Sequence, residues 1–131
     1  MRRLTLPSLL LLSSALACAD PVAPEVAGQW GGPEATLILS PTGGTVEYAC
    51  GAGTINPGWT LQRGGQWQAT GAYMSGGGPM PVEGRPPHPA TYAGHLAGDA
   101  LTFTVTVPEL GAVLGPYTVK RNAPGASEIC L

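Results

Sequence analysis

The fold is decided by a stretch near the C-terminus, Leu101-Thr102-Phe103-Thr104-Val105-Thr106-Val107, in which apolar and polar side chains alternate without a break. Successive side chains of a β-strand point to opposite faces, so this period of two predicts a strand with one buried face and one wet face. The preceding Gly98-Asp99 pair is typical of a tight hairpin turn. We therefore expect antiparallel strands joined by short turns.

The rest of the chain repeats this pattern between glycine-rich turns. Strands are expected at 34–40, 45–50, 66–73, 91–97 and 117–121, with shorter extended segments at 54–55 and 59–62. In the second of these strands the alternation places Val46, Tyr48 and Cys50 together on the inward face. This series of strands has to protect its edges, which a closed barrel or a sandwich does. The hairpin-like connections favour an all-β fold, a small antiparallel up-and-down β-barrel of about seven to eight strands, with a β-sandwich as the alternative.

The N-terminus has the pattern of an export signal. Two arginines precede a leucine-rich run, and small residues lead up to Cys18, which predicts a signal peptide over residues 1–17. Two interpretations stay open: Cys18 becomes the lipidated first residue of a lipoprotein, or an ordinary signal peptidase releases a soluble secreted or periplasmic protein. Residues 18–27 are proline-rich and aperiodic, which is typical of a tether, lipid-anchored or free, ahead of a barrel domain at 28–131.

The three cysteines favour lipidation of Cys18. If Cys18 carries lipid, Cys50 and Cys130 remain as one even pair, whereas an unlipidated chain would hold an odd thiol in an oxidising compartment. We expect Cys50 and Cys130 to form a structural disulfide. The alternative is a metal or redox site, but the sequence has no Cys-x-x-Cys motif and no clustering of cysteine with histidine.

Charge excludes some partners. Once Arg2 and Arg3 leave with the signal peptide, the side chains carry 4 basic and 8 acidic groups, a net charge of −4. Nucleic-acid binding needs clustered lysine and arginine, so we expect no nucleic-acid partner. The same charge disfavours adhesion to an anionic membrane surface, so any membrane link would run through the lipid on Cys18. Ala19 is not the aspartate that often retains lipoproteins at the inner membrane, which favours the outer membrane in a double-membraned host.

We find no motif for catalysis, and we expect no catalytic residue, metal or cofactor. The sequence has neither a Gly-x-Ser-x-Gly nucleophile elbow nor a His-Glu-x-x-His zinc motif. Of the two histidines, His88 falls in a long loop at 75–89 and His95 is phased outward on its strand, and both are interpreted as solvated surface residues. The loop is either a mobile lid or docking strip, or a plain connection.

Four aromatic residues are candidates for a ligand site. Trp67, Tyr73, Phe103 and Tyr117 all have inward phase on their strands. They would either line a ligand cup in the barrel mouth or simply form the core, and side chains fill the interior of most barrels of this size.

The chain also resembles two groups of known proteins. Gly28-Gln29-Trp30, together with inward-phased Arg121 on the last strand, resembles the calycin-type barrels, which include lipocalins, avidins and small bacterial metalloprotease inhibitors. The resemblance implies that Trp30 packs at a closed barrel end against Arg121. The second resemblance is to small, functionally uncharacterised bacterial lipoproteins, through Gly28-Gln29-Trp30-Gly31, a mid-chain Cys50, Tyr92-Ala93-Gly94 before Gly98-Asp99, and a terminal Cys130-Leu131.

Together these observations predict a non-enzymatic cell-envelope lipoprotein with a binding or accessory role. Its partners would be the membrane, through Cys18, and an envelope protein or a small apolar ligand. The alternatives are a secreted calycin-like carrier of a small apolar ligand, or an interaction protein resembling the barrel protease inhibitors, in which the segment 19–27 would insert into its partner.

Overall fold

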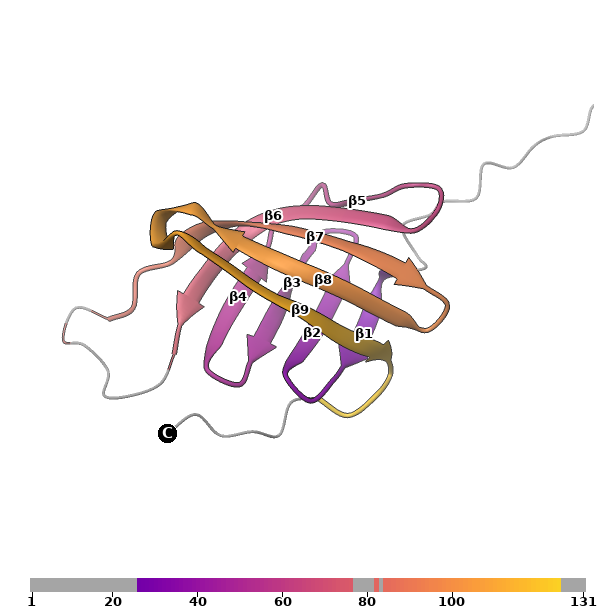
Figure 1. The fold of residues 1–131 in the computed structure, drawn as a ribbon, viewed down its shortest axis with the longest axis horizontal. Coiled ribbons are helices and arrows are strands. Elements are labelled where there is room, and N and C mark those ends of the chain that lie inside the picture. Colours follow the sequence, from indigo (N-terminus) through magenta and orange to yellow (C-terminus); the bar gives the residue numbers. More distant parts are fainter. Residues whose placement is uncertain (1–25, 77–81, 83, 126–131) are drawn as a thin grey trace, which may run out of the picture.

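The computed structural model describes residues 26–76, 82 and 84–125. Within these ranges the chain forms nine strands and one short 3-10 helix, η1, which confirms the all-β prediction (Figure 1). The elements are β1 (Gly28–Gly31), β2 (Ala35–Ser40), β3 (Gly43–Tyr48), β4 (Gly51–Ile55), β5 (Thr60–Leu61), β6 (Gln66–Ser75), β7 (His88–Ala97), β8 (Ala100–Val107), η1 (Pro108–Leu110) and β9 (Ala112–Arg121).

Eight of these strands close into an antiparallel barrel. The hydrogen-bonded order is β4-β3-β2-β1-β9-β8-β7-β6, and pairing between β4 and the second half of β6 joins the two ends. The extra strand β5 pairs only with the first half of β6. In Figure 1 the long strands β6 to β9 lie in front and the short strands β1 to β4 lie behind them. The predicted barrel is confirmed, and the chain does not form a sandwich.

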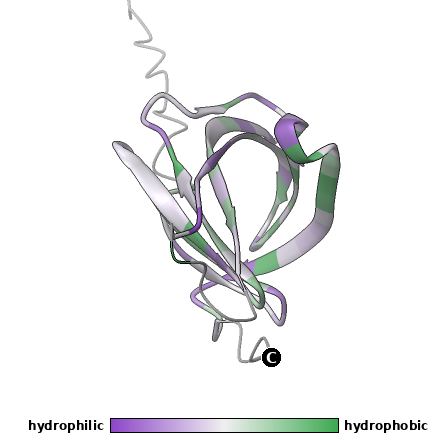
Figure 2. Ribbon diagram, turned by 90° about the vertical axis from the view of Figure 1, so that its left-hand side faces the viewer, coloured by the Kyte–Doolittle hydropathy of each residue, from purple (hydrophilic) through white to green (hydrophobic). Residues whose placement is uncertain are grey.

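Alternating side chains build the interior, as the strand at 101–107 predicts. In β8 the side chains of Leu101, Phe103, Val105 and Val107 are at most 1% exposed, whereas the threonines between them are partly exposed. The end-on view in Figure 2 shows the strands curving around this interior. Each fully buried side chain of this size stabilises the fold by about 1.5–3 kcal/mol relative to an exposed one.

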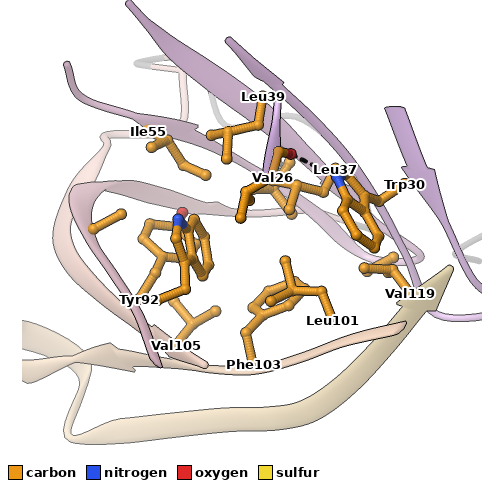
Figure 3. Close-up of a cluster of buried hydrophobic side chains, with 14 of the residues drawn as sticks. Val26, Trp30, Leu37, Leu39, Ile55, Tyr92, Leu101, Phe103, Val105 and Val119 are labelled. Atoms are coloured by element: carbon orange, nitrogen blue, oxygen red, sulfur yellow. Dashed lines mark hydrogen bonds between the residues drawn. The ribbon is translucent and has the colours of Figure 1, made fainter. Parts of the chain in front are cut away.

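Large side chains occupy the centre of the barrel. Trp30, Trp67, Tyr92 and Phe103 are the largest fully buried residues. Figure 3 shows aliphatic side chains such as Leu37, Leu101 and Val105 around Trp30, Tyr92 and Phe103. Trp67, Tyr92 and Phe103 contact one another with ring centres 6.0 to 6.4 Å apart. The interior at this level is therefore a packed core.

The sequence pattern does not predict the first strand, β1. Residues 28–31 were expected just ahead of the first strand, yet they form β1, which pairs with β2 on one side and β9 on the other. Without β1 the barrel would stay open between β2 and β9. The segment is too short to show alternation, and its two glycines hide the period. Val26, which falls in the predicted tether, is fully buried in the core.

Cys50 does not lie on the inward face of a strand, so that prediction is wrong. The strand β3 ends at Tyr48, and Ala49-Cys50 forms the turn into β4, where Cys50 is exposed. Gly51 already pairs with Tyr48, so only two residues remain to reverse the chain. The predicted partner Cys130 lies outside the described residues.

The strand β7 begins three residues earlier than predicted. His88 and Pro89 belong to β7 and pair with Tyr73 and Ala72 of β6, so the connection between β6 and β7 is shorter than the predicted loop at 75–89. The two prolines before His88 conceal the start of the strand, because proline is depleted in strands. Much of the connection, residues 77–81 and 83, lies outside the described residues.

Candidate binding site at the barrel mouth

The two ends of the barrel differ in how they are closed. At one end the indole nitrogen Nε1 of Trp30 donates a hydrogen bond of 2.7 Å to the carbonyl oxygen of Val26 (Figure 3). The guanidinium carbon of Arg121 lies 4.4 Å from the centre of the Trp30 ring. The two residues face each other on β1 and β9, so the barrel closure itself brings them together. This end is sealed by side chains, and we call it the closed end.

Three tyrosines gather at the opposite end. Tyr48 ends β3, Tyr73 lies near the end of β6, and Tyr117 lies in the middle of β9. The ring of Tyr48 contacts both others, with centres 5.6 Å from Tyr73 and 5.3 Å from Tyr117. All three are partly buried and pack against the core. We call this cluster of Tyr48, Tyr73 and Tyr117 the tyrosine mouth.

A surface pocket of about 420 Å³ opens over the tyrosine mouth. Besides the three tyrosines, it is lined by Glu34, Ala49, Cys50, Gly115 and Pro116. The volume lies within the range of small-molecule sites, which is about 300–1,000 Å³. Other surface depressions among the described residues have volumes of about 410, 400 and 560 Å³, so the lining by three tyrosines, and not the size, distinguishes this pocket.

Glycines on β4 make room for the tyrosine side chains. A β-carbon at Gly53 would lie 2.5 Å from the hydroxyl oxygen of Tyr92, and one at Gly51 would lie 3.2 Å from that of Tyr73. Both glycines are on the inward face of β4, where the other strands carry large side chains. The short strand therefore leaves space for the rings of Tyr73 on the neighbouring strand β6 and of Tyr92 on β7.

A β-bulge in β9 shapes the opposite wall of the pocket. Phe103 faces Tyr117 and Val105 faces Leu114, so β9 advances by three residues where β8 advances by two. Gly115 and Pro116 sit within this bulge and line the pocket. Bulges re-aim side chains and are frequent beside functional sites. Here the bulge lets Tyr117 face inward again directly below Pro116.

The tyrosine hydroxyls at this end lie close to one another. The Tyr92 hydroxyl donates a hydrogen bond of 2.9 Å to the carbonyl oxygen of Ala72. The Tyr48 hydroxyl is buried and interacts with the hydroxyl of Tyr92, whose oxygen remains able to accept a hydrogen bond. The Tyr48 hydroxyl therefore faces the interior and not the pocket. In the core, Nε1 of Trp67 is buried and has no hydrogen-bond partner among the described residues.

Burial raises the pKa of the phenols at this end. Loss of hydration raises the pKa of Tyr48 well above that of a free tyrosine, and it also raises the pKa of Tyr92. It also raises the pKa of Tyr117, with smaller contributions from Tyr73 and from the nearby carboxylate of Glu34. At neutral pH the pocket wall is therefore uncharged apart from Glu34.

The four aromatic candidates fall into two groups. Trp67 and Phe103 are at most 1% exposed and belong to the core. Tyr73 and Tyr117 line the pocket at the mouth. Tyr48 was not among the candidates, although its inward phase near a strand end is a signal that would have included it.

The histidines lie apart from this pocket lining. The ring nitrogen Nδ1 of His88 lies 2.8 Å from Oε2 of Glu109, a residue of η1. His88 was expected to be a solvated loop residue, but its side chain is only 21% exposed. His95 lies on β7 and is exposed. Among the described residues, no group of three or more histidine, cysteine, aspartate or glutamate side chains could hold a metal ion.

Some predicted residues lie beyond the parts of the chain that the structure describes. They are the signal peptide at 1–17, Cys18 and Cys130, so lipidation and the Cys50–Cys130 disulfide stay predictions.

In the connection between β6 and β7, Nη1 of Arg85 donates a hydrogen bond of 3.0 Å to the carbonyl oxygen of Ser75. Within residues 26–76, 82 and 84–125, no helix is long and apolar enough to cross a membrane.

Comparison with known proteins finds no family model, no curated protein and no solved structure that matches this chain.

Proposed function

We propose that this protein is a non-enzymatic lipoprotein of the cell envelope that binds a small molecule at the tyrosine mouth. The observation that carries the binding role is the pocket of about 420 Å³ over Tyr48, Tyr73 and Tyr117. Its aromatic wall offers contact with ring carbons, and Glu34 at its rim offers a carboxylate. The core behind the pocket is filled, so the ligand would sit at the mouth and not within the barrel.

A fragment screen tests the binding role. Small aliphatic and aromatic fragments would be added to the soluble chain from residue 19 onward, and contact would be detected by saturation-transfer NMR. Fragments that bind should lose most of their signal with Tyr117→Ala and with Tyr73→Ala. The control is Ile38→Ala, because Ile38 is 51% exposed on β2 and does not line the pocket. Hits that survive both tyrosine substitutions would refute the assignment of the site.

The contact between His88 and Glu109 can be interpreted in two ways. In enzymes that activate a nucleophile, a carboxylate often orients a histidine, and the histidine removes the proton of the nucleophile. The contact between His88 and Glu109 matches the carboxylate–histidine part of such a site. The other half is a serine, threonine or cysteine on the second ring nitrogen, and no described residue makes that hydrogen bond. We interpret the contact as a structural one that holds η1 against β7. Hydrolytic activity toward ester or amide substrates that is lost with His88→Ala would contradict this interpretation.

The envelope location is proposed from the sequence. Cys18 would carry the lipid, and Cys50 would pair with Cys130. The exposed turn position of Cys50 is compatible with a partner arriving from outside the barrel. Intact mass of the natively expressed protein, with and without reduction and alkylation, tests both points. A lipid adduct on Cys18 with no alkylation before reduction is expected. An unlipidated mass that starts at Cys18 or Asp20 would favour the alternative, a secreted soluble carrier.

The protease-inhibitor alternative has less support. It would use the segment at 19–27 for insertion into a partner. Val26 of that segment is fully buried and accepts the Trp30 hydrogen bond, so its last residues serve the fold.

A further inference from the structure

The pocket at the tyrosine mouth carries a charge of one sign. Of its described lining residues, Glu34 alone has a charged side chain. Glu34 is exposed at the rim, between β1 and β2, and makes no ion pair with any described residue. Lys120 lies beyond Glu34, in a neighbouring depression that Glu34 also borders, and does not line the pocket itself. The pocket therefore offers a carboxylate without a described ion-pair partner beside three aromatic rings.

Aromatic rings and a carboxylate attract the same kind of ligand. The face of a tyrosine ring is electron-rich and attracts cations, and aromatic walls recognise quaternary ammonium groups in this way. The rings of Tyr73 and Tyr117 meet that of Tyr48 at 63° and 47°, so the wall presents ring faces and edges at an angle and not a flat stack. An anion would meet the Glu34 carboxylate and the negative ring faces, so this wall disfavours anions.

We infer that the tyrosine mouth binds an organic ammonium ion, with its cationic head against the three tyrosine rings and Glu34. This inference rests on the proposed binding function and names the chemical class of its ligand. A compact ammonium ion fits a pocket of about 420 Å³ at this position.

The test compares a cation with its neutral copy. Choline and 3,3-dimethylbutan-1-ol have the same shape and hydroxyl group, but the second has carbon in place of the charged nitrogen. Both would be titrated into protein with ¹³C-labelled tyrosine. The chain has four tyrosines, three in the mouth, and buried Tyr92 serves as an internal reference. Choline should shift the ring signals of the mouth and bind at least about fivefold more tightly than the alcohol.

Three variants separate the contribution of the Glu34 charge to choline affinity from those of the Lys120 charge and the Tyr117 ring. Glu34→Gln should weaken choline about threefold and leave the alcohol unchanged, because an exposed carboxylate contributes modestly. Lys120→Gln changes a charge next to Glu34 in the opposite sense and should leave choline affinity equal or slightly higher. Tyr117→Leu keeps an apolar side chain but removes the electron-rich ring, so it should weaken choline more than the alcohol.

The outcomes distinguish the two proposals. Equal affinity for choline and the alcohol, or a mouth that binds neutral fragments and not choline at millimolar concentration, would overturn the ammonium inference and leave the binding function standing. A mouth that binds neither choline nor any neutral fragment would overturn both. Choline binding that moves the Tyr92 signal but not those of the other tyrosines would also overturn the inference, because the site would then lie elsewhere.

Discussion

The closed end and the tyrosine mouth both combine aromatic rings with a charged side chain. They differ in how many of their polar groups have a partner within the protein. At the closed end the Trp30 ring is fully buried, its N–H donates to Val26, and Arg121 lies over its face. At the mouth three aromatic rings are only partly buried, and the carboxylate of Glu34 beside them has no ion-pair partner among the described residues. Polar groups that all have partners within the protein stabilise the fold, whereas a polar or charged group without such a partner can bind a ligand.

Substitution at the closed end should have the largest effect on stability. Trp30→Ala removes the centre of that end and should lower the free energy of unfolding by about 3–5 kcal/mol, measured by urea denaturation. Trp30→Phe keeps a ring but removes the N–H donor to Val26 and should cost less. If Trp30→Ala left the unfolding midpoint within error of the wild type, the closed end would not be the stabilising end.

A side chain on β4 should have the next largest effect. Gly53→Ala places a methyl group 2.5 Å from the Tyr92 hydroxyl and 2.8 Å from the Ala72 carbonyl oxygen. Such overpacking costs about 1–3 kcal/mol, and it should also disturb the hydrogen bond between Tyr92 and Ala72. Thermal unfolding and the Tyr92 ring signal in NMR would report both effects. Full wild-type stability would mean that β4 is not the source of the space at the mouth.

Two tyrosine hydroxyls provide a matched pair with a smaller expected difference. Tyr92→Phe loses the 2.9 Å hydrogen bond and leaves the Ala72 carbonyl without it, so it should cost about 1 kcal/mol. Tyr48→Phe removes the hydroxyl that interacts with Tyr92 but leaves the bond from Tyr92 to Ala72 in place, so it should cost less than Tyr92→Phe. A larger loss of stability with Tyr48→Phe than with Tyr92→Phe would contradict this order.

The stability of the protein at alkaline pH should reflect the burial of these tyrosines. Burial raises the pKa of Tyr48, Tyr92 and Tyr117 in the folded state above that of tyrosine in the unfolded chain, which is about 10. Above that pH the unfolded chain loses protons that the folded protein retains, so stability is full below about pH 10 and falls as the pH rises further. Denaturation at successive pH values should show this fall, and Tyr48→Phe should make it shallower. A stability that stays constant through this range would contradict the burial of the phenols.

Much of the fold follows from local sequence, and the exceptions have physical reasons. The unbroken alternation at 101–107 corresponds to β8 almost residue for residue, because a half-buried strand leaves that pattern directly. β1 was not predicted because four residues with two glycines carry no period, although this strand closes the barrel. The start of β7 was not predicted because prolines flank His88 on both sides, and proline is uncommon in a strand.

The candidate site was less accessible to sequence reasoning. Inward phase identified Tyr73 and Tyr117 but could not separate them from Trp67 and Phe103, because depth along the barrel depends on register between strands. Glu34 lies in the β1–β2 turn and Pro116 in the bulge of β9, and neither the turn nor the bulge leaves a periodic signal in the sequence.

Ligands should therefore bind at the mouth and not at the closed end. One NMR titration decides between the two ends, with choline or the tightest neutral fragment added to protein in which both tyrosine rings and tryptophan indole groups are labelled. Trp30 and Trp59 report the closed end, since their indole nitrogens donate to Val26 and Ser40 there. We predict shifts of Tyr48, Tyr73 and Tyr117 with the two indole signals unmoved. Shifts of Trp30 or Trp59 without shifts of the three tyrosines would contradict binding at the mouth.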